Sequence, residues 1–354
     1  MTHAAGLAPK AASLLALLGA VAFSPTVSSA QQAGTSTWVL VYAGGPKRPS
    51  YSVSDFVHLI AYVDTADRPG GWLCTGAIFL EIFAPSGHAF ATWIGGQPAN
   101  GDDWNAYLHV VFDSGGALAR LDSAVSSVGR QVGPLPKKFP VMVMIPYPDP
   151  HVSRLDSPWG SFSLAENSGR LEAVESYVNE VVKRFHGSRY TNVELVGFYW
   201  LNESISGSDT SLTTDVARRI HKLGLRFYWI PYYTAGNVDA WARMGFDRAW
   251  LQPNFFFNPA VSPLRLDSAV ERARSLGMGL EIEFDGRLYS DPRYFDRLDP
   301  YLSTLSRASD LRRQDLVIYD GAGALIRLAT RKDSLSRGLY SRLVTTLVAE
   351  RGVH

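Results

Sequence analysis

Short apolar runs rich in β-branched and aromatic residues recur along the chain and are separated by longer segments of mixed polarity. A strand that is buried on both faces, as in a parallel sheet, reads as a near-continuous apolar run. Eight runs fit this pattern: Trp38–Tyr42, Ala77–Phe83, Pro140–Pro146, Val193–Trp200, Leu225–Pro231, Arg248–Gln252, Met278–Phe284 and Leu316–Tyr319.

The intervening segments predict helices. In Ser52–Val63, apolar residues fall at helical spacing and Ser52 or Ser54 can cap the first turn. Similar patterns predict helices over 116–129, 170–185, 213–223, 238–244, 267–276, 293–306 and 335–350.

Alternating strands and helices imply right-handed parallel units, and eight such units favour a closed barrel. We therefore predict an α/β fold, a single-domain (β/α)8 TIM barrel over residues 38–354. The rival is an open doubly wound sheet, but no Gly-x-Gly-x-x-Gly turn follows the first strand.

Two connections, Pro85–Asp113 and Tyr147–Gly169, are long for a compact domain. Loops of this length are usually functional. Trp93 and Trp104 in the first loop could extend a binding site, although packing in the core is an equal alternative.

The N-terminus has the pattern of a secretory signal. Lys10 supplies a positive charge, Ala11–Phe23 is apolar, and small residues precede a cleavage site near Gln31. We expect residues 1–30 to be a signal peptide, residues 31–37 a linker, and the mature protein to be secreted or periplasmic. Retention of the segment as an anchor is the alternative; after cleavage, no stable membrane insertion is expected.

Composition narrows the chemistry. The net charge of +1 over 354 residues gives no reason to expect nucleic acid as a partner. The single cysteine, Cys74, excludes an intramolecular disulfide and a cysteine-based zinc cluster. The histidines show no metal-ligand spacing, and neither a phosphate-binding loop nor a Gly-x-Ser-x-Gly elbow is present. No metal and no cofactor is therefore predicted.

In a barrel, residues at the carboxyl ends of the strands share one rim, where catalytic groups gather. Here that rim is rich in carboxylates, amides and phenols. The residues expected to bind substrate are Tyr42, Tyr147, Trp200, Asn202, Tyr232, Gln252, Asn254, Glu281, Asp285 and Asp320.

Two acids at this rim suggest a reaction. Glu203 follows the fourth strand, while Glu281 and Glu283 alternate with apolar residues in the seventh and so share its inner face. Facing carboxyls are the equipment for glycoside hydrolysis, with Glu203 as acid/base and Glu283 as nucleophile. The competing explanations are that Glu203 is an acid at a helix N-terminus and that the strand acids pair with an interior Arg or Tyr.

Two resemblances agree with this interpretation. Asn202-Glu203 after strand four and Glu283 in strand seven resemble the retaining (β/α)8 glycosidases, whose acid/base and nucleophile stand there; Ser204 departs from the proline common in that clan. A larger part of the chain, from about 38 to 325, resembles an uncharacterised bacterial family, domain of unknown function 4855. The matching stretches are Ile145–Pro148, Gly197–Glu203, Trp229–Tyr233, Gly245–Asp247, Gln252–Asn254 and Gly279–Glu283.

We therefore expect a secreted glycoside hydrolase with a retaining mechanism that acts on an oligo- or polysaccharide. The alternatives are a non-catalytic carbohydrate-binding protein on a degenerate barrel and a surface scaffold protein. A binder would lack the pair of facing acids, and a scaffold would show an apolar exposed patch.

Overall fold

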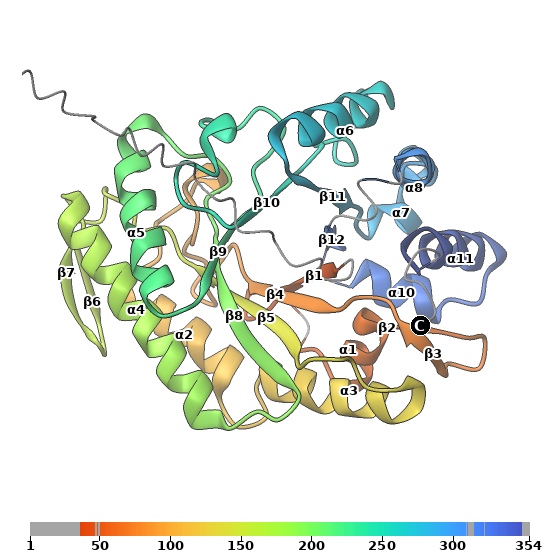
Figure 1. Cartoon of the computed structure of the whole chain (residues 1–354), viewed down its shortest axis with the longest axis horizontal. Coiled ribbons are helices and arrows are strands. Elements are labelled where there is room, and N and C mark those ends of the chain that lie inside the picture. Colours follow the sequence, from red (N-terminus) through yellow and green to blue (C-terminus); the bar gives the residue numbers. More distant parts are fainter. Residues whose placement is uncertain are drawn as a thin grey trace, which may run out of the picture. The chain divides into compact units, whose positions relative to one another are not determined.

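The computed structural model describes residues 36–348 except 47, 49, 309, 311–314 and 322. Eight of its strands close into a parallel barrel in the order β1-β12-β11-β10-β9-β8-β5-β4 (Figure 1). This confirms the predicted (β/α)8 architecture. The barrel strands are β1 (Thr37–Tyr42), β4 (Gly76–Leu80), β5 (Phe139–Ile145), β8 (Val193–Trp200), β9 (Arg226–Trp229), β10 (Arg248–Leu251), β11 (Gly279–Glu283) and β12 (Leu316–Tyr319).

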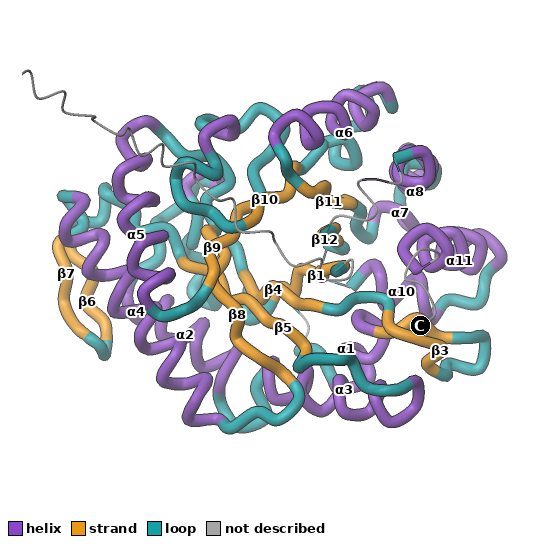
Figure 2. The backbone as a smooth tube through the Cα atoms, viewed as in Figure 1, coloured by secondary structure: helices purple, strands orange, loops and turns teal. Residues whose placement is uncertain are grey.

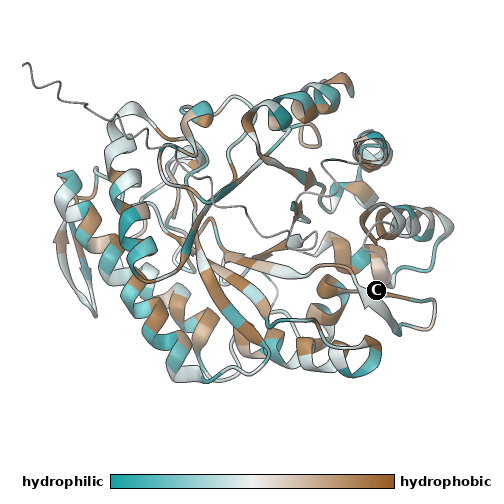
Figure 3. Ribbon diagram, in the orientation of Figure 1, coloured by the Kyte–Doolittle hydropathy of each residue, from teal (hydrophilic) through white to brown (hydrophobic). Residues whose placement is uncertain are grey.

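Helices surround these strands (Figure 2). Their bounds are α1 (Val53–Ile60), α2 (Gly101–Phe112), α3 (Ala117–Val132), α4 (Asn167–Ser188), α5 (Thr210–Lys222), α6 (Leu264–Leu276), α7 (Arg287–Ser290), α8 (Leu298–Arg307), α10 (Ala324–Thr330) and α11 (Ser334–Val348). The helices carry both hydrophobic and hydrophilic residues, as expected of helices that pack one side on a barrel (Figure 3).

Both long connections, predicted as loops, contain regular structure. The first holds the 3₁₀ helix η1 (Thr92–Ile94) and α2, which begins at a capping box formed by Asn100 and Asp103. Trp104 lies on α2 and is fully buried, so it packs in the core instead of extending a binding site.

The second connection holds an antiparallel hairpin of β6 (Arg154–Ser157) and β7 (Gly160–Ser163). Another hairpin, of β2 (Ala61–Val63) and β3 (Pro69–Trp72), lies between α1 and β4. Short 3₁₀ helices complete the fold: η2 (Gly207–Asp209), η3 (Val238–Ala240) and η4 (Pro292–Tyr294).

Aromatic rings mark the inside of the barrel. Trp38 on β1 contacts Tyr228 on β9 and Trp250 on β10, with ring centroids 6.2 Å apart in both pairs. Because β1 is a neighbour of neither strand in the barrel order, these contacts cross the interior. Because side chains alternate between the two faces of a strand, the residues two and four positions along the strand from each of these aromatic residues also face inward.

The predicted signal peptide, its cleavage site and most of the linker lie outside the described residues. Within the described part of the chain, every helix is too short or too polar to cross a bilayer.

Candidate active site at the carboxyl end of the barrel

Strand register places Glu281 and Glu283 on the inner face, and Glu203 interacts with them from the loop after β8. Trp250 pairs with Gly279, so Glu281 and Glu283, two and four residues later, belong to the same face. Tyr228 pairs with Tyr199, so Tyr199 also faces inward. Glu203 lies three residues beyond the end of β8, where it interacts with the side chains of Gln252 and Glu283. The barrel thus brings together acids that are far apart in sequence.

Glu203 is the member of this group that is partly exposed. The pKa of its carboxyl is raised from 4.5 to about 7, chiefly by burial; the charge of Glu283 adds to this rise and a hydrogen bond with the side chain of Gln252 opposes it. The Gln252 amide also donates to the carbonyl of Ile230 at 2.8 Å, which fixes its orientation. A carboxyl that is half protonated near neutral pH can donate a proton to a substrate.

Glu283 is 0% exposed, and hydrogen-bond donors hold both of its oxygens. The backbone N–H groups of Asn254 and Phe255 donate to its two oxygens at 3.1 Å each, and the Tyr301 hydroxyl donates to Oε2. Burial raises the pKa of Glu283 to about 7, and these hydrogen bonds oppose that rise because they favour the carboxylate. The carboxyl is therefore fixed toward the loop after β10 and toward α8.

Glu281 and a group of tyrosines complete the cluster. Burial, followed by the charges of Glu283 and Glu203, raises the pKa of Glu281 well above 4.5. The pKa of Tyr199 is raised well above 10, chiefly by burial and then by the charges of Glu203 and Glu281. Three tyrosines near the acids were not predicted: Tyr199, Tyr319 and Tyr301. The period of two in strands four and eight is a signal for Tyr199 and Tyr319.

Asn202 faces another way than its neighbour Glu203. Its side-chain oxygen accepts hydrogen bonds from the backbone N–H and the hydroxyl of Thr92, at 3.3 and 3.1 Å. Its side-chain nitrogen donates to the carbonyl of Ser204. The amide that was expected to hold a sugar hydroxyl instead ties the β4–α2 loop to the β8–α5 loop.

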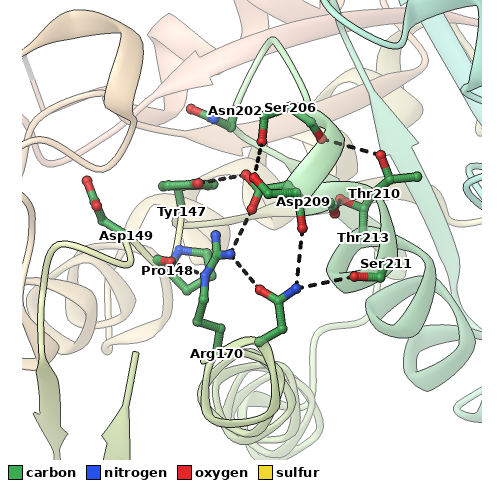
Figure 4. Close-up of polar contacts among 12 residues, drawn as sticks. Tyr147, Pro148, Asp149, Arg170, Asn202, Ser206, Asp209, Thr210, Ser211 and Thr213 are labelled. Atoms are coloured by element: carbon green, nitrogen blue, oxygen red, sulfur yellow. Dashed lines mark hydrogen bonds and ion pairs between the residues drawn. The ribbon is translucent and has the colours of Figure 1, made fainter. Parts of the chain in front are cut away.

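A buried polar network fixes the far end of the β8–α5 loop (Figure 4). Arg170 on α4 forms an ion pair with Asp209 at 2.7 Å and donates to the carbonyl of Pro148. The hydroxyl of Tyr147 donates to the other oxygen of Asp209 at 2.7 Å. Tyr147, which was expected at the substrate, therefore serves to anchor the loop that carries Glu203.

Three further residues expected to bind substrate have structural partners. Trp200 is buried against Tyr147 and Phe227, on the strand face opposite to Tyr199. Asp285 pairs with Arg287 at 2.7 Å. Asp320 is fully buried and accepts hydrogen bonds from backbone N–H groups at the start of α10. These contacts give all three side chains a structural role.

The remaining expected residues lie near the acids. Tyr42 faces inward, contacts Tyr319 edge-on and feels the charges of Glu281 and Glu203. Tyr232 is partly exposed, and its backbone forms an isolated β-bridge with that of Gln252. Asn254 adopts a left-handed backbone conformation, φ 50°, and accepts a hydrogen bond from the backbone N–H of Tyr233. The loop after β10 is thereby shaped so that its N–H groups meet Glu283.

Metal binding has no visible basis in the described residues, where no group of three or more His, Cys, Asp or Glu side chains is placed to hold an ion. The cluster can transfer protons, because Glu203 is partly exposed and has a raised pKa, while Glu281 and Glu283 are buried beside it.

Residues 37–345 match the family described as Domain of unknown function (DUF4855). The chain belongs to this family. The match covers all eight barrel strands, so the DUF4855 domain of this chain and its barrel coincide. No curated protein matches the sequence.

Solved structures similar to this DUF4855 domain include two mutants of the tryptophan synthase alpha-subunit from the hyperthermophile Pyrococcus furiosus. Each is 11% identical and covers 89% of this chain and 98% of its own, with TM-scores of 0.39 and 0.41. Similarity at this level says nothing about the reaction, and the fold assignment stands on the closed barrel itself.

Proposed function

We propose that this protein hydrolyses glycosidic bonds, with Glu203 as the general acid/base and Glu283 as the nucleophile. The observation that carries the proposal is Glu203: a partly exposed carboxyl of raised pKa, on the inner face of the barrel mouth, that interacts with a second carboxyl from β11. Such a pair of acids with separated roles is what glycoside hydrolysis requires.

In this scheme the protonated Glu203 gives its proton to the glycosidic oxygen as the bond to the anomeric carbon breaks. The Glu283 carboxylate attacks that carbon and forms a glycosyl-enzyme ester. Glu203, now ionised, takes a proton from water, and the resulting attack on the ester releases the sugar and restores both carboxyls. The substrate is an oligo- or polysaccharide, whose hydroxyls suit the amide of Gln252 and the phenols of Tyr42 and Tyr232.

The complete burial of Glu283 favours a second function, carbohydrate binding without hydrolysis. A nucleophile must touch the anomeric carbon, and here the carboxyl is occupied by Tyr301 and by the loop after β10. If Glu283 only supports that loop, Glu203 and the phenols would form a binding surface and no bond would be cleaved.

A comparison of three variants separates these functions. The protein is assayed against a panel of bacterial and plant polysaccharides, with product anomers followed by NMR. Under the proposal, Glu203→Gln and Glu283→Gln each lower turnover by at least about a hundredfold, while Glu203→Gln retains ligand binding. Glu194→Gln is the matched control, because Glu194 is an exposed residue of β8, the strand that leads to Glu203.

Retained anomeric configuration supports the nucleophilic role of Glu283, and inverted configuration rules it out. If the wild-type protein and all three variants bind a polysaccharide and leave it intact, the protein is a carbohydrate-binding protein and not a hydrolase.

The proposal includes export from the cytoplasm. The apolar segment Ala11–Phe23 and the small residues before Gln31 support it. N-terminal sequencing of the protein recovered from its native host tests this directly, with Gln31 as the expected first residue. A mature chain that still begins at residue 1 would contradict cleavage.

A further inference from the structure

Trp93 stands apart from the other tryptophans. All nine tryptophans lie in the described residues, and eight are buried or partly buried, whereas 45% of Trp93 is exposed. Within the described part of the chain, its side chain makes no hydrogen bond and no ring contact. An indole left open to water lacks the hydrophobic stabilisation that burial would give, so its face is free to pack against a ligand.

The backbone around Trp93 is fixed. The N–H of Phe90 donates to the carbonyl of Ile82, and the carbonyl of Phe90 accepts from the N–H of Tyr147. On the other side of the loop, the N–H of Ala89 donates to the carbonyl of Gln97, and the carbonyl of Ala89 accepts from the N–H of Ala99, at 2.8 Å each. The short helix that carries Trp93 is therefore held by neighbours before and after it.

The strongest link joins this loop to the candidate acid. Thr92, the residue before Trp93, is bound twice by the side-chain oxygen of Asn202, the residue before Glu203. Adding the covalent lengths to the 3.3 Å hydrogen bond, the Cα atoms of Trp93 and Glu203 can be no more than about 16 Å apart. An exposed aromatic ring is thus kept within a few sugar lengths of the proposed proton donor.

We propose that Trp93 forms a sugar-binding subsite, stacking on a pyranose ring of an oligosaccharide whose scissile bond lies at Glu203. A broad apolar ring presents an electron-rich face to the C–H groups of a sugar. Asn202 acts as the positioning residue, and because the loop is already ordered, binding does not incur the cost of ordering it. The inference rests on the proposed function and adds that the ligand is a chain of several sugars.

The test measures affinity as a function of chain length in the Glu203→Gln background, so that hydrolysis does not consume the ligand. Calorimetry is run with di- and hexasaccharides of β-1,4-linked glucose, xylose, mannose and N-acetylglucosamine. For the hexasaccharide that binds, Trp93→Ala should weaken affinity by about tenfold, and Trp93→Tyr should restore most of it. The matching disaccharide should lose less than about twofold.

Leu223→Ala is the matched control, since Leu223 is also 45% exposed but precedes β9, at the opposite end of the barrel. Equal hexasaccharide affinity with and without Trp93 overturns the subsite, as does failure of the parent to bind any member of the panel. Hydrolysis by the wild-type protein is scored separately. Loss of affinity in Trp93→Ala without any hydrolysis therefore supports the subsite and removes the hydrolase.

Discussion

The hydroxyl of Tyr301, on α8, donates a hydrogen bond to Oε2 of Glu283 at the end of β11. Both side chains are fully buried, so water cannot replace the donor if it is removed. An outer helix thus helps to set the ionisation of the candidate nucleophile.

Tyr301→Phe should raise the pKa of Glu283 above about 7, because one of the donors that favours the carboxylate is lost. The acidic limb of the pH–rate profile, which reports ionisation of Glu283, should move to higher pH by on the order of one unit. The free energy of unfolding should fall by about 1–3 kcal/mol. Tyr294→Phe is the control, since that hydroxyl donates to the carbonyl of Phe257; an equal shift in both variants would contradict the prediction.

Glu281→Gln should alter how stability depends on pH. The pKa of Glu281 in the folded protein lies well above its ordinary 4.5, so its contribution to stability is fully present below pH 4.5 and is lost as pH rises through the folded-state pKa. An uncharged glutamine of the same shape has no such loss. Denaturant unfolding at pH 4 and pH 9 should show a smaller decline in the variant than in the wild type.

Glu194→Gln serves as the control for that comparison, because Glu194 is exposed. A variant at position 281 whose stability declines with pH as steeply as that of the wild type would show that Glu281 does not titrate in this range.

Gln252→Met should raise the pKa of Glu203 above about 7, since the hydrogen bond from Gln252 lowers it. A general acid must be protonated, so activity is lost as pH rises through its pKa. The basic limb of the pH–rate profile should therefore move to higher pH in this variant. Gln131→Met, at an exposed position on α3, should leave the limb in place; no shift in Gln252→Met would separate Gln252 from the ionisation of Glu203.

Arg170→Met should destabilise the protein by about 3–5 kcal/mol, because Asp209 would remain buried without its cation. Equilibrium unfolding measures this loss. Arg218→Met breaks the exposed pair with Asp215 on α5 and should cost less than about 1 kcal/mol. Similar losses for the two variants would mean that the buried network of Figure 4 adds little to stability.

Local pattern was enough to predict the barrel. The runs at Val193–Trp200 and Leu316–Tyr319 have the same bounds in the structure, because a strand buried on both faces leaves a continuous apolar signal. The helix α2 was missed, since its start depends on a capping box in a segment whose loop-like residues dominated the pattern. The β6–β7 hairpin was missed because its short, largely exposed strands carry no apolar run.

The sequence by itself determined which acids could meet. A period of two assigns Glu281 and Glu283 to one strand face, and the end of an apolar run marks the place of Glu203; both follow from local backbone geometry. Only the tertiary structure decided what each side chain contacts. Tyr301 reaches Glu283 from a distant helix, Asn202 turns to Thr92, and Tyr147 bonds to Asp209. Such contacts depend on how separate elements pack in space, and no spacing within a single segment encodes them.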